Sequence, residues 1–316
     1  MTTPSTNSPQ TLRAALLGAQ TAHSVSPQLH ELLFPILRER SGADHNAVDY
    51  AKVDLPDTAR FNDWVKAAAS AGFKGANVTQ PYKYDAFDAA NYHHGVAREI
   101  KVANTLAFFD DRIVAASTDG EGFMSALGRE LSHFDLSRYH FITLGAGATA
   151  KSVLYSMLIR WMPLSFTLAG RSYQKSSELM DFVGANSPGP TLKVCTIEDL
   201  KGQARPEDPC VVLNTTPLGQ GKNRENVLPD FDWQEDDIAL DVIYSPFDTE
   251  FLSRAEEAGA KRVSGLGMLI EQAALSQTFW LTNEIPTDSP LTLEEYFEIK
   301  SKLKQAITEM NAKANG

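Results

Sequence analysis

The stretch YHFITLGAGATAKSVLYSMLIRWMPLSFTLAGRS, residues 139–172, decides the fold of this chain. It opens with an apolar run at 141–144, which is typical of a buried strand. A glycine turn follows, then a helix with apolar residues at helical spacing, and then a second strand-like run at 165–169. Strand, glycine turn, helix and strand in this order predict a dinucleotide-binding unit of an α/β protein.

The glycine turn itself comprises Gly145, Ala146, Gly147 and Ala148. Glycine lets the backbone approach a pyrophosphate closely, and the N-terminus of the following helix offers it N–H groups and a positive dipole. Because a short glycine pattern also occurs in ordinary strand-to-helix turns, a turn that holds no ligand is the alternative.

The end of the second strand indicates which nucleotide is bound. A pocket for NAD usually has an acidic residue there, which holds the ribose 2′-hydroxyl. Between Gly145 and Ser177 the chain has no Asp or Glu, and it offers Arg171, Ser172 and Lys175 instead. These groups suit a dianionic 2′-phosphate, so the sequence favours NADP, unless Arg171 and Lys175 are a solvated pair in a loop.

Length, composition and charge limit the classes of function. At 316 residues, with 43% hydrophobic and 22% charged residues, the chain has an ordinary globular composition and enough length for two cores. Its net charge of −11 argues against a nucleic-acid partner, because binding to phosphates requires a basic surface. Any anion must therefore bind in a local basic or hydrogen-bonding pocket.

Several features of the sequence predict a cytoplasmic protein. Cys195 and Cys210 lie in strand-like apolar runs, so they are expected in the core of a protein from a reducing compartment. Residues 1–11 are polar and have no apolar segment typical of a signal peptide. No apolar run approaches the roughly 18 residues of a membrane span, so no membrane partner is expected.

The first candidate binding groups are Ser24 and Ser26, which precede a helical apolar stripe. The stripe is expected at Leu29, Leu32, Leu33 and Ile36. Two hydroxyls beside the N–H groups of a helix start could receive a carboxylate. Alternatively, Ser26 is only the N-cap of the helix.

A second group of candidates lies at the end of the strand expected at 75–79. In an α/β sheet, ligands bind where strands end. Asn77, Thr79 and Lys83 are close together here, just before and after Pro81, which cannot continue a strand ladder. A lysine in a loop is usually solvated, which is the alternative for Lys83.

Asn104 and Asp119 are candidates in the next segment. Asn104 lies in an otherwise apolar strand expected at 100–109, where a buried amide needs partners, so it is either a structural bracket or a ligand contact. Thr118 and Glu121 match a capping box. Asp119 is then either functional or only a first-turn acid favoured by the helix dipole.

The remainder of the chain alternates expected strands and helices, as a parallel sheet requires. Met268 and Gln272 are four residues apart, and so on one face of an expected helix. A linker at 283–290 leads to an amphipathic C-terminal helix, which packs on the body of the protein or on a second subunit, so a homodimer is one possibility. Its capping pair is Thr292 and Glu295, and its apolar stripe comprises Tyr296, Ile299, Leu303, Ile307 and Met310.

Together these segments resemble the shikimate dehydrogenase family over about residues 12–282, with the family's motifs in the family's order. The most specific match is GANVTQPYK at 75–83, which resembles the segment of the catalytic lysine. The other matches are SVSP at 24–27, Asn104-Thr105, STDGEG at 117–122, GAGATA at 145–150, GRSYQK at 170–175, NTTPLG at 214–219, DVIYSP at 241–246 and GLGMLIEQAA at 265–274.

The resemblance implies an α/β fold of two domains with a cleft between them. An open α/β domain for substrate would comprise residues 1–120 with 266–316, and a Rossmann-type domain for NADP would comprise residues 121–265. The implied reaction is the reversible, NADP-linked interconversion of shikimate and 3-dehydroshikimate, without a metal.

The resemblance also implies a role for each candidate. Lys83 and Asp119 would be the acid–base pair, because oxidation of a secondary alcohol needs a group that accepts the hydroxyl proton and stabilises the oxyanion. Ser24, Ser26 and Tyr244 would bind the substrate carboxylate, and Asn77, Thr79, Lys83, Asn104, Asp119 and Gln272 its ring hydroxyls. NADP would be held by Gly145, Ala146, Gly147, Ala148, Arg171, Ser172, Lys175, Val242 and Gly265, with Met268 against the nicotinamide.

Four positions depart from the family pattern. Ser117 replaces the Asn of the aspartate motif, Ala148 replaces a glycine, Gly170 replaces the Asn before the arginine, and Glu31 replaces an Asn. They leave open a divergent quinate or shikimate dehydrogenase that accepts NAD as well as NADP. A relative that senses a ligand without catalysis is a third possibility.

Overall fold

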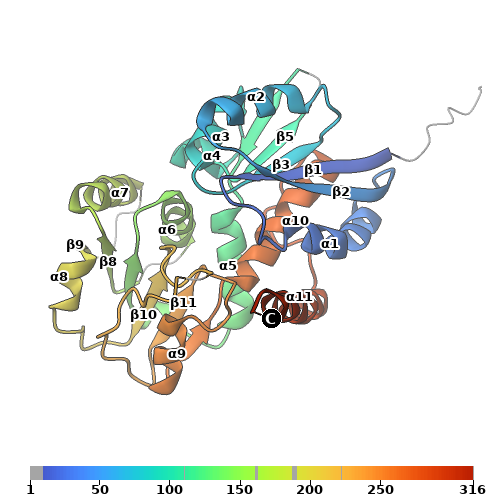
Figure 1. Cartoon of the computed structure of the whole chain (residues 1–316). Coiled ribbons are helices and arrows are strands. Elements are labelled where there is room, and N and C mark those ends of the chain that lie inside the picture. Colours follow the sequence, from blue (N-terminus) through green and yellow to red (C-terminus); the bar gives the residue numbers. More distant parts are fainter. Residues whose placement is uncertain (1–9, 110, 161–162, 187–190, 222, 316) are drawn as a thin grey trace, which may run out of the picture. The chain divides into compact units, whose positions relative to one another are not determined.

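The computed structural model describes residues 10–109, 111–160, 163–186, 191–221 and 223–315 (Figure 1). The chain divides into two compact units, each with its own six-stranded sheet. The first unit comprises Met1–Thr118 and Ile270–Gly316, and the second comprises Asp119–Leu269. The α/β fold class predicted from the sequence is confirmed.

The sheet of the second unit has the strand order β12-β11-β10-β7-β8-β9, and all neighbouring strands are parallel. Its two halves extend in opposite directions from the central pair β7 and β10, which is the order of a Rossmann fold. The strands are β7 His140–Leu144, β8 Ser165–Gly170, β9 Thr191–Thr196, β10 Cys210–Asn214, β11 Ile238–Asp241 and β12 Lys261–Val263.

Helices cover both faces of this sheet, as a parallel sheet requires because both of its faces are apolar. Apolar side chains of α5 (Asp119–Glu130), α6 (Ala148–Arg160) and α7 (Tyr173–Asn186) form the core on one face. Those of α8 (Ile197–Lys201) and α9 (Glu250–Glu257) form the core on the other. A short 3-10 helix, Leu136–Arg138, precedes β7.

The sheet of the first unit is mixed, with the order β2-β1-β3-β5-β6-β4. β1 is parallel to β2 and β3, while β5 is antiparallel to both β3 and β6. The strands are β1 Gln10–Gly18, β2 His45–Asp54, β3 Gly75–Val78, β4 Tyr92–His93, β5 Thr105–Phe108 and β6 Ile113–Ala116.

The two faces of this sheet are covered by helices from both ends of the chain. Helices α2 (Thr58–Ala68) and α3 (Lys83–Ala89) pack on one face. Helices α1 (Ser26–Ser41) and α10 (Leu266–Thr282) pack on the other. α10 lies so close that a Cβ atom on Gly75 would be 2.0 Å from Trp280 Nε1, which explains the glycine there. A short helix, α4 (Val96–Ile100), precedes β5.

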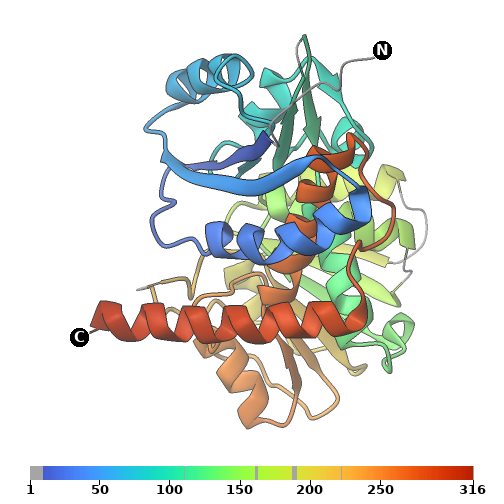
Figure 2. The same ribbon diagram turned by 90° about the vertical axis from the view of Figure 1, so that its right-hand side faces the viewer.

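The C-terminal helix α11 (Leu293–Asn315) packs against α1 of the same unit (Figure 2). The predicted capping box is present, because Thr292 N–H donates to Glu295 and Glu295 N–H donates to the Thr292 hydroxyl. The Glu295 carboxylate also accepts two hydrogen bonds of 2.7 Å from Arg40. Most of the predicted stripe is buried, namely Tyr296, Ile299, Leu303 and Ile307.

Three local predictions were wrong. Ile100 ends α4 instead of beginning a strand, since β5 starts only at Thr105. The buried face of α1 comprises Leu29, His30, Leu33, Phe34 and Leu37, so Leu32 and Ile36 are only half-buried. Thr118 and Glu121 form no capping box, because the Thr118 hydroxyl bonds to Asn104 and Ser276 while Glu121 pairs with Arg160.

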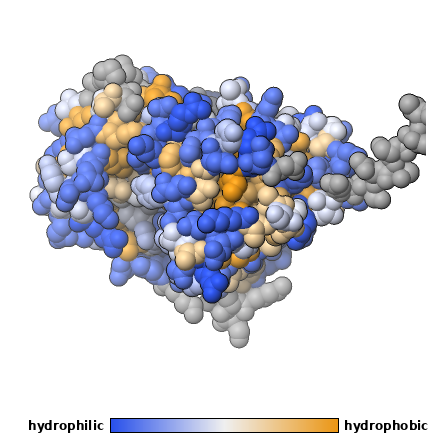
Figure 3. Space-filling view, turned by 90° about the horizontal axis from the view of Figure 1, so that it is seen from above, coloured by the Kyte–Doolittle hydropathy of each residue, from blue (hydrophilic) through white to orange (hydrophobic). Residues whose placement is uncertain are grey.

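Cys195 and Cys210 are buried and unpaired, as predicted. Within the described ranges no helix is long and apolar enough to cross a membrane. On the face shown in Figure 3, hydrophobic residues are scattered among hydrophilic ones.

Candidate active site

The glycine turn of the second unit lies at the carboxyl end of β7. Gly145 has a φ of +106°, and a Cβ atom there would be 2.6 Å from the Thr215 hydroxyl, so only glycine fits. No heavy atom lies within 4 Å of the position that a Cβ atom on Gly147 would take. This open space lies directly before α6, whose first-turn N–H groups suit a pyrophosphate.

The sequence at this turn is a variant of the usual dinucleotide pattern. Ala150 is fully buried at the position where a third glycine or an alanine allows close helix–strand packing. The replacement at Ala148 is therefore no obstacle, because the first and second glycines and the small third residue are all present.

The turn after β10 is fixed against the end of β7. Thr215 donates to the Leu144 carbonyl from its backbone N–H at 2.9 Å and from its hydroxyl at 2.7 Å. Asn214 Oδ1 accepts the N–H of Thr216 at 2.9 Å and its hydroxyl at 2.7 Å. The motif Asn214-Thr215-Thr216 thus positions the floor of the glycine turn.

Arg171, Ser172 and Lys175 follow β8 and are all exposed. The Ser172 hydroxyl accepts the Lys175 backbone N–H at 3.4 Å at the start of α7. Within the described part of the chain, the Arg171 guanidinium and the Lys175 ammonium have no hydrogen-bond or ion-pair partner. Two such cations beside a helix start fit a dianionic phosphate.

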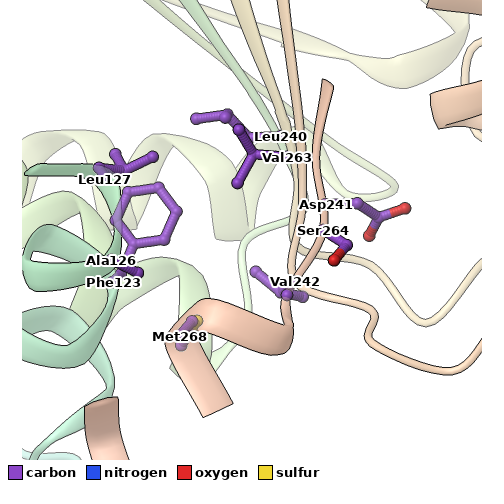
Figure 4. A pocket seen from close by; sticks show the side chains of 10 residues that line it. Phe123, Ala126, Leu127, Leu240, Asp241, Val242, Val263, Ser264 and Met268 are labelled. Carbon is purple, nitrogen blue, oxygen red and sulfur yellow. The ribbon is translucent and has the colours of Figure 1, made fainter. Parts of the chain in front are cut away.

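A small apolar pocket of about 10 Å³ lies at the carboxyl ends of β11 and β12. Val242, Gly265 and Met268, three of the predicted cofactor residues, line it together with Phe123 and Leu127 of α5. Figure 4 shows Phe123 and Leu127 on one side of the pocket and Met268 at its base. A Cβ atom on Gly265 would be 2.1 Å from the Val242 carbonyl oxygen, so glycine is required there. Tyr244 follows on the same loop and is half-buried.

Asp241 also borders this pocket, but its carboxylate is directed away from it (Figure 4). It accepts hydrogen bonds from the Thr249 hydroxyl at 2.8 Å, the Ile243 N–H at 3.0 Å and Asn214 Nδ2 at 3.2 Å. Burial raises the pKa of Asp241 to about 7, against the effect of these three donors. Through its hydrogen bond with Asn214 at the end of β10, Asp241 joins the ends of β10 and β11.

In the first unit, the predicted substrate residues lie at one edge of the sheet. The parallel register pairs Leu17 with Val78, so the loops after β1 and β3 begin at the same edge. Because β5 runs antiparallel to β3, Asn104 at its start lies at this edge too, and its carbonyl accepts the Val78 N–H at 2.8 Å. Thr118 is bonded to Asn104.

Ser24 and Ser26 are bonded to each other after β1, with hydroxyl oxygens 2.9 Å apart. The alternative that Ser26 is only the N-cap of the helix is wrong. Ser26 is the first residue of α1, Val25 occupies the N-cap position, and no side chain caps the helix. The reason is that the Ser24 hydroxyl already accepts the Ser26 N–H, at 3.2 Å.

Asn104 is held in one orientation. Its Oδ1 accepts the Thr118 backbone N–H at 2.7 Å, so its NH2 group faces the Thr118 hydroxyl at 2.9 Å and Gln272 Oε1 at 3.3 Å. Asn104 is 2% exposed. The amides of Asn104 and Gln272, which the family resemblance assigned to one substrate site, are thus brought together.

Asn77 is bonded only to protein groups among its described contacts. Its Oδ1 accepts the Tyr50 hydroxyl at 2.8 Å and lies 3.1 Å from His30 Nε2. Its Nδ2 donates to Ser276 at 3.0 Å. Neither His30 nor Tyr50 was identified from the sequence, although a histidine between Leu29 and Leu33 in an apolar helix face is a detectable signal.

Lys83 and Thr79 follow β3 at this edge. Lys83 is the first residue of α3 and is 8% exposed, so the alternative of a solvated loop lysine is wrong. Thr79 is half-buried, and its methyl group packs on Gly18, where a Cβ atom would be 2.5 Å from it. Asp119 directly follows Thr118, begins α5 and is 5% exposed.

These features define a class of protein: a two-unit α/β protein whose second unit is a Rossmann-type nucleotide-binding unit. A family model described as the shikimate dehydrogenase substrate binding domain matches residues 16–106. A shikimate dehydrogenase (NADP(+)) of Aromatoleum aromaticum is 34% identical over 269 residues, which are 85% of this chain and 91% of that relative. The chain belongs to the shikimate dehydrogenase family, as its motifs predicted.

Solved structures agree in fold. A shikimate 5-dehydrogenase from Thermus thermophilus, in complex with NADP(H) and shikimate, has a TM-score of 0.71 and 25% identity, with 92% of this chain and 99% of that chain covered. Quinate dehydrogenase from Corynebacterium glutamicum, in complex with NAD, has a TM-score of 0.73 at 21% identity, with 92% and 98% covered. The second likeness shows the fold alone.

Proposed function

We propose that this protein is an NADP-dependent dehydrogenase that interconverts shikimate and 3-dehydroshikimate. The observation that carries the proposal is the 34% identity, across 85% of the chain, to a shikimate dehydrogenase (NADP(+)). The open glycine turn and the outward-facing cations after β8 support the choice of NADP.

Lys83 and Asp119 are the proposed acid–base pair. Oxidation transfers a hydride from the alcohol carbon to the nicotinamide, which supplies the redox chemistry when bound. The enzyme must take up the hydroxyl proton and stabilise the charge that develops on oxygen. Both side chains are nearly buried at the first residue of a helix, which favours fixed positions.

We assign the other predicted residues as follows. Ser24, Ser26 and Tyr244 would hold the substrate carboxylate through neutral hydrogen bonds. Thr79, Asn104 and Gln272 would recognise ring hydroxyls, and a site of this kind strongly rejects an analogue without the hydroxyl. The amide of Asn77 is bonded to protein groups, so we assign it a supporting role.

The second unit would hold the cofactor, and the first unit the substrate. In this proposal the pyrophosphate lies over the glycine turn and the 2′-phosphate lies against Arg171, Ser172 and Lys175. The pocket of Val242, Gly265 and Met268 lies on the nicotinamide side. We also propose the domain limits predicted from the sequence, namely residues 1–120 with 266–316 for the substrate domain and residues 121–265 for the NADP domain.

Two further points are proposals about the setting of the enzyme. Free buried cysteines and a net charge of −11 support a cytoplasmic protein that does not bind nucleic acid. A homodimer through α11 is supported only by two exposed apolar residues, Leu293 and Phe297. Analytical ultracentrifugation tests it.

The first experiment is a spectrophotometric assay of NADP and NAD reduction with shikimate and with quinate. We expect the highest kcat/KM for NADP with shikimate. A clear preference for NAD would contradict the cofactor assignment, and turnover of neither substrate would contradict the proposed reaction.

Substitution Lys83→Ala tests the acid–base role. We expect turnover to be lost while most of the affinity for shikimate remains, because the ammonium acts mainly on the charge that develops in the transition state. Isothermal titration with shikimate measures the affinity. A variant that stays active would remove Lys83 from the mechanism.

The second candidate is a quinate/shikimate dehydrogenase that also accepts NAD. The replacements at Ser117 and Gly170 favour it. A ligand sensor without catalysis is the third, and any measurable turnover excludes it.

A further inference from the structure

His30 is completely buried in the first unit and has four neighbours that fix its ring. The ring stacks on Tyr50, at a centroid distance of 4.1 Å, and also contacts Trp280, at 5.3 Å. The rings of Tyr50 and Trp280 are themselves 6.3 Å apart. The Nε2 atom of His30 lies 3.1 Å from Asn77 Oδ1, and its Nδ1 lies 2.8 Å from Gln277 Oε1. A buried polar ring held by two aromatic rings and two amides, in a mainly apolar helix face, requires an explanation.

The ring is neutral, because burial lowers the pKa of His30 to about 4. A neutral imidazole has one N–H group, and its other nitrogen accepts. Both ring nitrogens face an amide oxygen, and a neutral ring can donate to only one of them. The Asn77 amide is fixed, because its Oδ1 accepts the Tyr50 hydroxyl and its Nδ2 donates to Ser276. Among the described residues, the Gln277 amide has an Nε2 without a hydrogen-bond partner, and turning this amide by 180° lets it donate to Nδ1 of the ring, so we place the ring proton on the imidazole Nε2. Two donors thus hold the oxygen end of the Asn77 amide.

The opposite end of this amide leads toward the predicted substrate groups. Asn77 Nδ2 donates to the Ser276 hydroxyl at 3.0 Å. Ser276 in turn donates to the backbone carbonyl of Gln272 at 2.8 Å, which fixes the direction of its hydroxyl hydrogen. Its oxygen also lies 3.2 Å from the hydroxyl of Thr118.

The last links of the network reach Asn104 and Gln272. The hydroxyl of Thr118 accepts from Asn104 Nδ2 at 2.9 Å, and Asn104 Nδ2 also donates to Gln272 Oε1 at 3.3 Å. Every link is a neutral hydrogen bond between side chains that are buried or half-buried. Such networks hold one arrangement only when each member is satisfied.

We infer that His30 is a positioning residue for substrate recognition, which orients the amides of Asn104 and Gln272 through Asn77, Ser276 and Thr118. The inference rests on the proposed function, because it assigns those two amides to the substrate. In this inference His30 acts only through its side-chain neighbours. Its N–H group selects which end of the Asn77 amide faces the network.

A double-mutant cycle with His30→Phe and Asn77→Ala tests this coupling. Phe keeps an aromatic ring in the stack and removes the donor. His30→Phe should raise the KM for shikimate roughly three- to tenfold, the effect of one neutral hydrogen bond, with a smaller change in kcat. Asn77→Ala removes the bonds to His30, Tyr50 and Ser276 and should raise this KM at least as much. The double variant should be no worse than Asn77→Ala alone, because both changes break the same path. Additive effects on KM would overturn the inference.

Two controls separate positioning from loss of stability. His30→Gln places an amide N–H near the position of Nε2 and should restore KM to within about twofold of the wild type. Leu303→Ala removes buried apolar contacts on α11 in the same unit and should lower Tm without raising the KM for shikimate. If Leu303→Ala raises this KM as much as His30→Phe does, the effect is only one of stability and the inference fails.

The wild-type protein supplies an independent measurement, should the variants fail to fold. Nitrogen-15 NMR of the imidazole should show the Nε2–H tautomer at every pH from 5 to 8. An Nδ1–H tautomer, or a ring that becomes charged in this range, would overturn the inference. Absence of wild-type turnover with shikimate would instead contradict the proposed function, and the NMR result would be unaffected.

Discussion

At the scale of single residues, Asp241 makes stability depend on pH. In the folded protein its pKa is raised to about 7, whereas the unfolded chain has the ordinary value of 3.8. Between these values the folded state keeps a proton that the unfolded state has lost, so its contribution to stability falls as pH rises from about 4 to 7. The loss is at most about 4 kcal/mol.

Substitution Asp241→Asn should therefore remove this part of the pH dependence. Asparagine stays neutral, so the stability of the variant relative to the wild type should increase between pH 5 and pH 8. Urea unfolding of both proteins at the two pH values measures the difference. A constant difference would mean that Asp241 does not titrate in this range.

Arg171 offers a test of cofactor choice at a single side chain. Loss of a charge-assisted hydrogen bond to phosphate in Arg171→Ala should raise the KM for NADP roughly 10- to 100-fold. The KM for NAD should hardly change, because NAD has no 2′-phosphate. Steady-state kinetics with both cofactors decide the matter, and equal effects on the two would place Arg171 outside the 2′-phosphate site.

At the scale of helices and strands, α11 is the clearest case for a matched pair of substitutions. Leu303 is fully buried, whereas Leu293 on the same helix is 55% exposed. Leu303→Ala should lower the free energy of unfolding by about 2–5 kcal/mol, and Leu293→Ala by less than about 0.5 kcal/mol. Urea denaturation of both variants tests this, and similar losses would mean that α11 is not docked on α1.

Regular elements were the part of the structure that sequence reasoning predicted best. The strands of the Rossmann-type unit are short apolar runs bounded by Gly, Pro or polar turns, which makes β7 and β10 readable. Ile100 was misassigned because an apolar residue of a one-turn helix looks like the start of a strand. The buried face of α1 was predicted around Leu32 and Ile36 instead of His30, because these residues fit helical spacing as well as His30 does.

The sequence predicted which residues belong to the candidate site, but it did not predict which side chains they form hydrogen bonds with. Thr118 looked like a cap from its local spacing, yet it bonds to Ser276, 158 residues away in the chain. The sequence left the N-cap alternative for Ser26 open, because the hydrogen bonds between Ser24 and Ser26 leave no mark on the sequence pattern. Long-range hydrogen bonds of this kind depend on tertiary packing, which spacing along the chain does not encode.

At the scale of the whole molecule, the two units should differ in their ability to fold alone. The second unit is continuous and has a complete sheet covered on both faces. The first unit takes part of the cover of one sheet face, helix α10, from the end of the chain. A fragment of residues 119–269 should therefore show dispersed amide NMR signals, whereas residues 1–118 should not. A well-dispersed spectrum of the shorter fragment would contradict this reasoning.

The contact between Gly75 and Trp280 also determines when the first unit can complete its core during translation. At roughly 5–20 residues per second, a ribosome delivers Trp280 about ten to forty seconds after Gly75. Throughout that wait, the strand that carries Gly75 lacks its indole covering. An apolar surface that stays exposed for so long is a binding site for chaperones. The first unit can complete its core only when the last forty or so residues of the chain are being synthesised.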